Sequence, residues 1–72
     1  MNVLVFKTDI KTAERLQAVS PLLNNHPTVT GWSIDTEDID NVLRIEHSGL
    51  LNETDVIQLM STYGFTCQLL PD

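Results

Sequence analysis

The chain has 72 residues, the length of one small domain, and a domain of this size buries only about 60% of the surface of its unfolded chain. Its composition, 42% hydrophobic and 19% charged, is typical of a folded globular protein and argues against disorder. The net charge of −6 argues against nucleic acid and anionic membranes as partners, because phosphate groups are bound by clustered lysine and arginine side chains.

Cys67 is the only cysteine, so no internal disulfide can form, and the sequence has no Cys/His zinc pattern. No apolar run approaches the length of a membrane span, and Met1 leads directly into a strand-like segment without a basic leader. We therefore expect a cytoplasmic protein with a single domain over residues 1–72.

The first third of the chain predicts a strand and a helix. Residues 2–6 are a short apolar run rich in β-branched side chains, which favours a strand inside a sheet. Thr12 is a suitable helix N-cap, and Glu14 in the first turn complements the helix dipole. Pro21 is expected to kink or tighten this helix, which should end by about residue 25. The apolar stripe of the helix consists of Leu16, Val19, Leu22 and Leu23.

The middle of the chain predicts two strands, residues 29–34 and 42–47, joined by an acidic turn. Gly31 favours a bulge in the first of them, and this bulge would turn both Val29 and Trp32 toward the core. The second alternates apolar and polar residues, which is typical of a half-buried strand.

The C-terminal part predicts a second helix and a last strand. Asn52 is a good N-cap, and Asp55 three residues later completes an approximate capping box. Gly64 suits the position after the helix end, where a positive φ is favoured. Residues 65–70 form the last strand, with Cys67 on its core side. The predicted buried face of the helix is Val56, Ile57, Leu59, Met60 and Tyr63.

The element order is therefore βαββαβ. Two units of this kind predict an α+β fold of the ferredoxin-like type, a four-stranded antiparallel sheet with both helices on one face. Right-handed crossovers place the first and third strands in the centre of the sheet.

With these elements in place, the chain resembles a heavy-metal-associated domain, the copper-chaperone type of module, over nearly its whole length. Members of that family carry a Gly-Met-Thr-Cys-x-x-Cys loop before the first helix, and Asp9-Ile10 aligns with its Gly-Met pair. Tyr63-Gly64-Phe65 matches the Ala-Gly-Tyr of the family, and Asn52 falls on its usual Ser N-cap. The family's apolar and turn positions then fall, without a gap, on Val19, Leu23, Pro27, Val29, Trp32 and Ile34.

The resemblance breaks at the metal loop, whose two cysteine positions fall on Thr12 and Arg15. Cu(I) is a soft ion that needs thiolate ligands. A threonine hydroxyl is a poor ligand for it, and a guanidinium repels a cation. We therefore expect no metal cofactor and no metal transfer at this loop.

A basic cluster at the same loop is the first candidate site. It contains three of the four basic residues, at a helix N-terminus that already favours anions, so a carboxylate, a phosphate or an acidic partner could bind there. The alternative is that these are solvated side chains paired with Asp9 and Glu14, which contributes little. The site would consist of Lys7, Lys11, Thr12 and Arg15.

The second candidate is an apolar patch on the outer face of the sheet, which would mark an interface. It follows from turning Val3 and Val5 toward the helices. Because both sides of residues 2–6 are apolar, the alternative is that this strand faces the other way. The patch would consist of Leu4, Phe6, Val42 and Leu70.

No nucleophile with a positioned base is evident, so we expect no enzyme. The function that these observations favour is a non-enzymatic protein-interaction or self-associating module, whose partner is an unidentified protein or a second copy in a homodimer. The alternative is a small-anion binder, or a weak metal-ion binder with oxygen and imidazole ligands, at the loop before the first helix.

Overall fold

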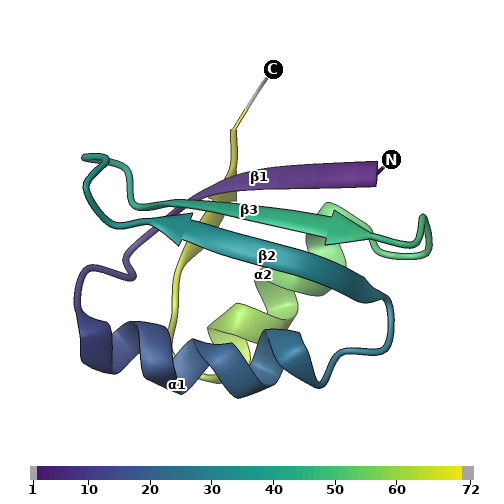
Figure 1. Ribbon diagram of the computed structural model, residues 1–72, viewed down its shortest axis with the longest axis horizontal. Helices are drawn as coiled ribbons and strands as arrows, with labels where there is room; N and C mark the ends of the chain where they lie inside the picture. The colour runs from purple at the N-terminus through teal and green to yellow at the C-terminus, as the bar shows by residue number, and fades with distance from the viewer. Residues whose placement is uncertain (1, 71–72) are drawn as a thin grey trace.

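The computed structural model describes residues 2–70, and its elements follow one another in the predicted order. Figure 1 shows both helices on the same side of a single sheet. No helix of the described residues is long and apolar enough to cross a membrane. The strands are β1 (Asn2–Thr8), β2 (Val29–Asp35), β3 (Val42–His47) and β4 (Cys67–Leu69), and the helices are α1 (Ala13–Asn24) and α2 (Glu53–Thr62).

The sheet is antiparallel and has the strand order β2-β3-β1-β4. The first and third strands are therefore central, which confirms the predicted ferredoxin-like α+β fold. The predicted bulge in β2 is also confirmed, since the register of β2 with β3 shifts between Val29 and Gly31. Val29 and Trp32 both pack against the core as a result.

The prediction that Leu4 and Phe6 face away from the helices is wrong. Phe6 pairs with Leu43 and Leu4 with Ile45, and directly paired residues lie on the same face of a sheet. Phe6 is 0% exposed, and Leu4 packs against the same core. This orientation buries a phenylalanine and a leucine on the helix side and leaves the smaller valines of β1 on the open side, so it removes more apolar area from water.

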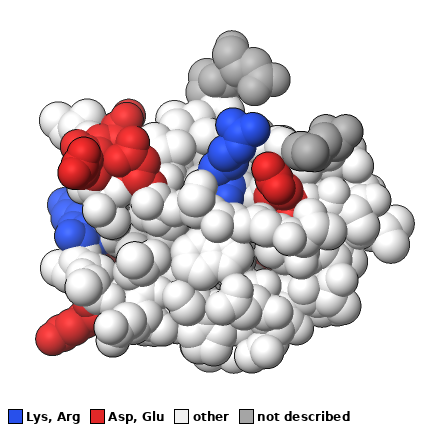
Figure 2. All heavy atoms as spheres, viewed as in Figure 1, with Lys and Arg blue, Asp and Glu red and all other residues white. Residues whose placement is uncertain are grey.

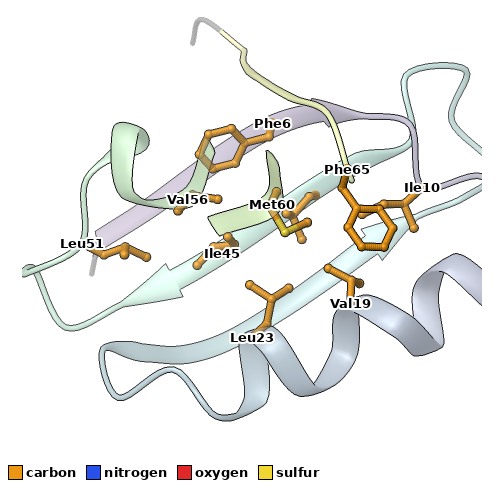
Figure 3. Packing of buried hydrophobic residues seen from close by; sticks show 10 residues of the cluster. Phe6, Ile10, Val19, Leu23, Ile45, Leu51, Val56, Met60 and Phe65 are labelled. Atoms are coloured by element: carbon orange, nitrogen blue, oxygen red, sulfur yellow. The ribbon is translucent and has the colours of Figure 1, made fainter. Parts of the chain in front are cut away.

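The core lies between the sheet and the two helices. Figure 3 shows Phe6 and Ile45 of the sheet, Met60 of α2 and Val19 of α1 directed toward one another. Phe65, between α2 and β4, closes one end of this cluster.

Helix α1 runs through Pro21 and ends at the predicted place. Pro21 lacks the N–H that would bond to Gln17, but both residues are exposed, so water can satisfy the free carbonyl. The predicted N-cap is confirmed, because the Thr12 side chain accepts a hydrogen bond from the Arg15 N–H.

Helix α2 is closed at both ends by local signals. Asn52 and Asp55 form a complete capping box. At the other end Gly64 has φ +85° and donates to the Ser61 carbonyl, while the Phe65 N–H donates to Met60, which is the Schellman arrangement. Tyr63 was predicted on the buried face but is 58% exposed, because the chain leaves the helix there and Phe65 takes the core position.

Strand β4 is shorter than predicted and lacks the first two residues and the last residue of the predicted range 65–70. The N–H of Phe65 is used by the helix cap and that of Thr66 donates to Asp9, so pairing with β1 begins at Cys67.

Candidate functional site at the loop between β1 and α1

The loop between β1 and α1 is fixed in place by buried contacts at its start and in its middle. Thr8, at the end of β1, is nearly buried, and its hydroxyl donates to the Asn41 carbonyl at 2.6 Å. The same oxygen accepts from the Ile10 N–H at 3.2 Å. Ile10 is fully buried and anchors the loop in the core. The loop therefore presents a defined surface beside the β2–β3 turn.

Sequence reasoning missed the role of Thr8. The residue that accepts its hydrogen bond lies 33 positions away, so no local pattern reports the contact. Ile10 carried a faint signal as the single apolar residue between Phe6 and Ala13.

Thr12 and Arg15, the two positions that the resemblance assigns to cysteines, are both engaged within the chain. Thr12 Oγ1 accepts from the Arg15 N–H at 3.2 Å. The Arg15 guanidinium donates from Nη2 to Asp9 Oδ2 at 3.2 Å and lies over the Phe65 ring, 5.3 Å from its centroid. Asp9 Oδ1 accepts from the Thr66 N–H at 3.1 Å. Asp9 therefore ties the loop, α1 and the start of β4 together.

The remaining basic residues of the cluster are exposed. Lys7 forms an ion pair with Asp40 of the β2–β3 turn at 3.4 Å. Lys11 has no ion pair with any residue of the described chain. Lys7 and Lys11 line the same surface hollow of about 490 Å³, whereas Arg15 turns toward Asp9. The structure thus brings two of the predicted basic residues to one hollow and uses the third inside the chain.

Acidic side chains surround this end of the molecule. Figure 2 shows them gathered over the β2–β3 turn. The turn contributes Asp35, Glu37, Asp38 and Asp40, to which the loop and α1 add Asp9 and Glu14. These six acids outnumber the three basic residues of the cluster, so this end is acidic overall.

Ile39 at the tip of the same turn is 93% exposed and also lines the hollow. A single exposed aliphatic residue is common on protein surfaces, so Ile39 matters here only because it borders the hollow beside Lys7 and Lys11. The sequence pattern gave no reason to single it out within an acidic turn.

Cys67 lies beside the hollow, on the core side of β4 as predicted, and packs against the core. Burial, with a smaller contribution from the negative charge of Asp9, raises the pKa of Cys67 from its ordinary 9.0 to about 11. The thiol is therefore protonated at neutral pH and is neither a ready nucleophile nor a ready ligand. Within residues 2–70, no three His, Cys, Asp or Glu side chains come together in a way that could hold a metal ion.

The predicted apolar patch is divided by the structure. Leu4 and Phe6 belong to the core, as described above. Val42 lies on the open side, paired with Asp35, and Leu70 donates its N–H to Val5 at the other edge of β1. Val42 and Leu70 are thus the members of the predicted patch that remain on the open face.

The fold is that of copper-chaperone and other heavy-metal-associated domains. A chain from the solution structure of the Atx1–Cu(I)–Ccc2a complex matches with a TM-score of 0.85 and 14% identity, over 100% of this chain and 99% of that one. The yeast copper transporter domain Ccc2a, solved in its apo and Cu(I)-loaded states, gives 0.82 and 14%, over 100% and 99%. The CsoZ metallochaperone gives 0.74 and 15%, over 97% of both chains.

No protein-family model and no curated protein sequence matches the chain. The likeness to the solved structures therefore establishes the fold, and function has to be argued from the side chains of this chain.

Proposed function

We propose that this chain is a non-enzymatic protein-interaction module that has the fold of a metal chaperone without thiolate metal binding. The observation that carries the proposal is the state of the two positions that the resemblance assigns to metal ligands. Thr12 caps α1, and Arg15 is held against Asp9 and Phe65. Both positions serve the fold, and neither side chain suits a soft cation.

The single cysteine does not offer a substitute ligand set. Cu(I) sites use soft sulfur ligands, and Cys67 is the only thiol in the chain. Its raised pKa disfavours the thiolate, because the charged form loses solvation on the core side of β4. The Arg15 guanidinium, paired with Asp9, places a positive charge at the position that the resemblance assigns to the second cysteine.

Protein contact is the function that we infer for a chain of this fold whose loop lacks thiols. One of the matched chains comes from a complex of two proteins, Atx1 and Ccc2a. In the present chain, the end at the β1–α1 loop offers exposed Ile39 as an apolar anchor, with Lys11 beside it in the same hollow. Such an apolar residue within a charged rim suits recognition of another protein.

A Cu(I) titration tests the loss of thiolate binding. The wild-type chain and a Thr12→Ser/Arg15→Ser control should leave Cu(I) with a competing chelator. A Thr12→Cys/Arg15→Cys variant should gain one Cu(I) per chain, because the two cysteines restore the family's Cys-x-x-Cys spacing on a backbone with the same fold. Stoichiometric Cu(I) binding by the wild type would refute the proposal, and failure of the cysteine variant would show that Thr12 and Arg15 are not the ligand positions.

Partner docking is tested with two matched variants. Ile39→Asp should abolish capture of a partner by the immobilised protein, whereas Leu50→Asp should leave it intact. Leu50 is a suitable control because it is also a large aliphatic residue and is 81% exposed. It lies after the end of β3, whereas Ile39 lies before the start of that strand. Equal capture by both variants would exclude docking at the β1–α1 end.

A small-anion binder is the second candidate, favoured by the convergence of Lys7 and Lys11 on one hollow. Phosphate titration followed by NMR would then shift the amide signals of the loop, and Lys11→Ala would remove the shift. Because the end is acidic overall, we rank this function below protein docking.

A further inference from the structure

The open face of the sheet, turned away from both helices, has an apolar centre with two charged residues in it. Val3 and Val5 of β1 lie there, paired with Glu46 and Arg44 of β3. Val42 belongs to the same face, and Leu70 flanks Val5. The valines and Leu70 are half-buried, so the described chain leaves them partly open to solvent.

This face differs from the rest of the surface in its charge. Arg44 places a positive charge on it, Asp35 and Glu46 place two negative charges, and Lys7 at its edge is paired with Asp40. With two positive and three negative charges these residues carry −1, whereas the whole chain carries −6. Like-charge repulsion therefore opposes contact between two copies less strongly here than over most of the surface.

Arg44 and Glu46 are neighbours on one face of a central strand, yet neither forms an ion pair within residues 2–70. Arg44 is exposed, and Glu46 leans across Gly31, with Oε2 3.1 Å from the point where a β-carbon on Gly31 would lie. A recess of about 320 Å³ opens beside the carboxylate and is bordered by Gly31, Ser33 and Arg44. A half-buried carboxylate at an open recess is suited to a cationic side chain from outside the chain.

We propose that the occupant of this face is a second copy of the same chain. In a two-fold, face-to-face dimer, a contact of one residue with a second residue of the other copy occurs twice, because the symmetry repeats it with the copies exchanged. Arg44 of each copy then enters the recess of the other and pairs with Glu46 there, and the valines pack between them. The two opposite charges next to one apolar strip make the face complementary to itself.

This inference deepens the proposed function, since it names one partner of the interaction module. It concerns the open face and leaves the β1–α1 end free to bind another protein. Its failure is distinguishable from failure of the proposed function, because the Cu(I) titration does not depend on self-association.

Sedimentation equilibrium of the full chain over a range of concentrations tests the dimer. The wild type should approach twice the chain mass of 8.1 kDa. Arg44→Glu and Glu46→Arg should each weaken self-association at least tenfold, because like charges then face each other across the two-fold axis. The double variant Arg44→Glu/Glu46→Arg should dimerise again, and an equal mixture of the two single variants should form a heterodimer.

A control of equal charge change lies off the face. Glu37→Arg, in the β2–β3 turn, matches the charge change of Glu46→Arg and should keep the wild-type mass. Circular dichroism confirms that each variant is folded. A wild-type chain that stays monomeric up to about 1 mM overturns the proposal. The proposal is also overturned if neither Arg44→Glu nor Glu46→Arg weakens the dimer, or if the double variant Arg44→Glu/Glu46→Arg does not restore it.

Discussion

The β1–α1 end and the open face of the sheet both carry charged side chains, but they differ in whether those side chains are paired within the chain. At the loop end Arg15 is paired with Asp9 and Lys7 with Asp40, so two of the three basic residues are satisfied inside the chain. On the open face Arg44 and Glu46 have no such partner within residues 2–70. The first arrangement holds elements together, and the second leaves complementary charges available.

This difference shows why a cluster of basic residues in a sequence is a poor guide to a ligand. Lys7, Lys11 and Arg15 are close in sequence and suggest an anion site, but carboxylates of the same chain pair with two of them. The Asp40 carboxylate comes from 33 residues beyond Lys7, across the β2–β3 turn. Arg44 and Glu46 look like an ordinary strand pattern, and only the fold leaves them together on an uncovered face.

The largest effect is expected from the residue that decides which face of β1 is buried. Phe6→Ala should destabilise the domain by about 3–5 kcal/mol, because it removes a fully buried aromatic ring and leaves a cavity. Val5→Ala, on the open face, should cost about 1 kcal/mol or less. Urea unfolding measures both.

If Phe6→Ala does not fold, Phe6→Leu provides the milder comparison and should still cost more than Val5→Ala. A larger loss from the valine variant would mean that the helix side and the open side of β1 had been exchanged.

The next largest effect concerns Cys67, which lies between the hollow and the core. With a pKa of about 11 against an ordinary 9.0, its thiolate fraction at neutral pH should be about 100-fold below that of an exposed cysteine. Alkylation by iodoacetamide should therefore be slow and should accelerate up to about pH 11. A rate that levels off near pH 9 would contradict the buried placement.

The same shift predicts a pH dependence of stability. Between pH 9 and 11 the unfolded chain loses the thiol proton while the folded chain keeps it. The stability that Cys67 contributes is therefore full below pH 9 and is lost as the pH rises toward 11. The difference in melting temperature between the wild type and Cys67→Ala should shrink or reverse over this range.

The smallest effects separate the two ion pairs of the loop end. Asp9→Ala removes the acceptor of both Arg15 and the Thr66 N–H and should cost about 1–2 kcal/mol. Lys7→Ala breaks an exposed pair with Asp40 and should cost about 0.5 kcal/mol or less. Asp9→Asn keeps an acceptor for Thr66 and should fall between them. Equal effects at Asp9 and Lys7 would mean that Asp9 does not tie α1 to β4.

Much of the fold could be predicted because its signals are local. The Asn52–Asp55 capping box, the Thr12 cap and the positive φ at Gly64 each depend on residues within one helical turn. The bulge at Gly31 likewise follows from a residue that fits no regular strand position. Right-handed crossovers then leave few ways to arrange βαββαβ.

The candidate site could be predicted only in part. The sequence placed the loop and its basic residues and offered Asp9 as a partner for them, which Arg15 uses. It could not supply Asp40 as the partner of Lys7 or the buried hydroxyl of Thr8. Both depend on the β2–β3 turn lying against the end of β1, a contact between segments more than 30 residues apart.

The sequence by itself determined the elements, their order and the absence of a second thiol. The tertiary structure decided which way β1 faces. Residues 2–6 are apolar on both sides, so periodicity carries no information about them. Pairing of Leu4 and Phe6 with Ile45 and Leu43 settles the question, because strand register is a long-range property and a shift of one residue exchanges the two faces. That choice sends Phe6 into the core and leaves the valines beside Arg44 and Glu46.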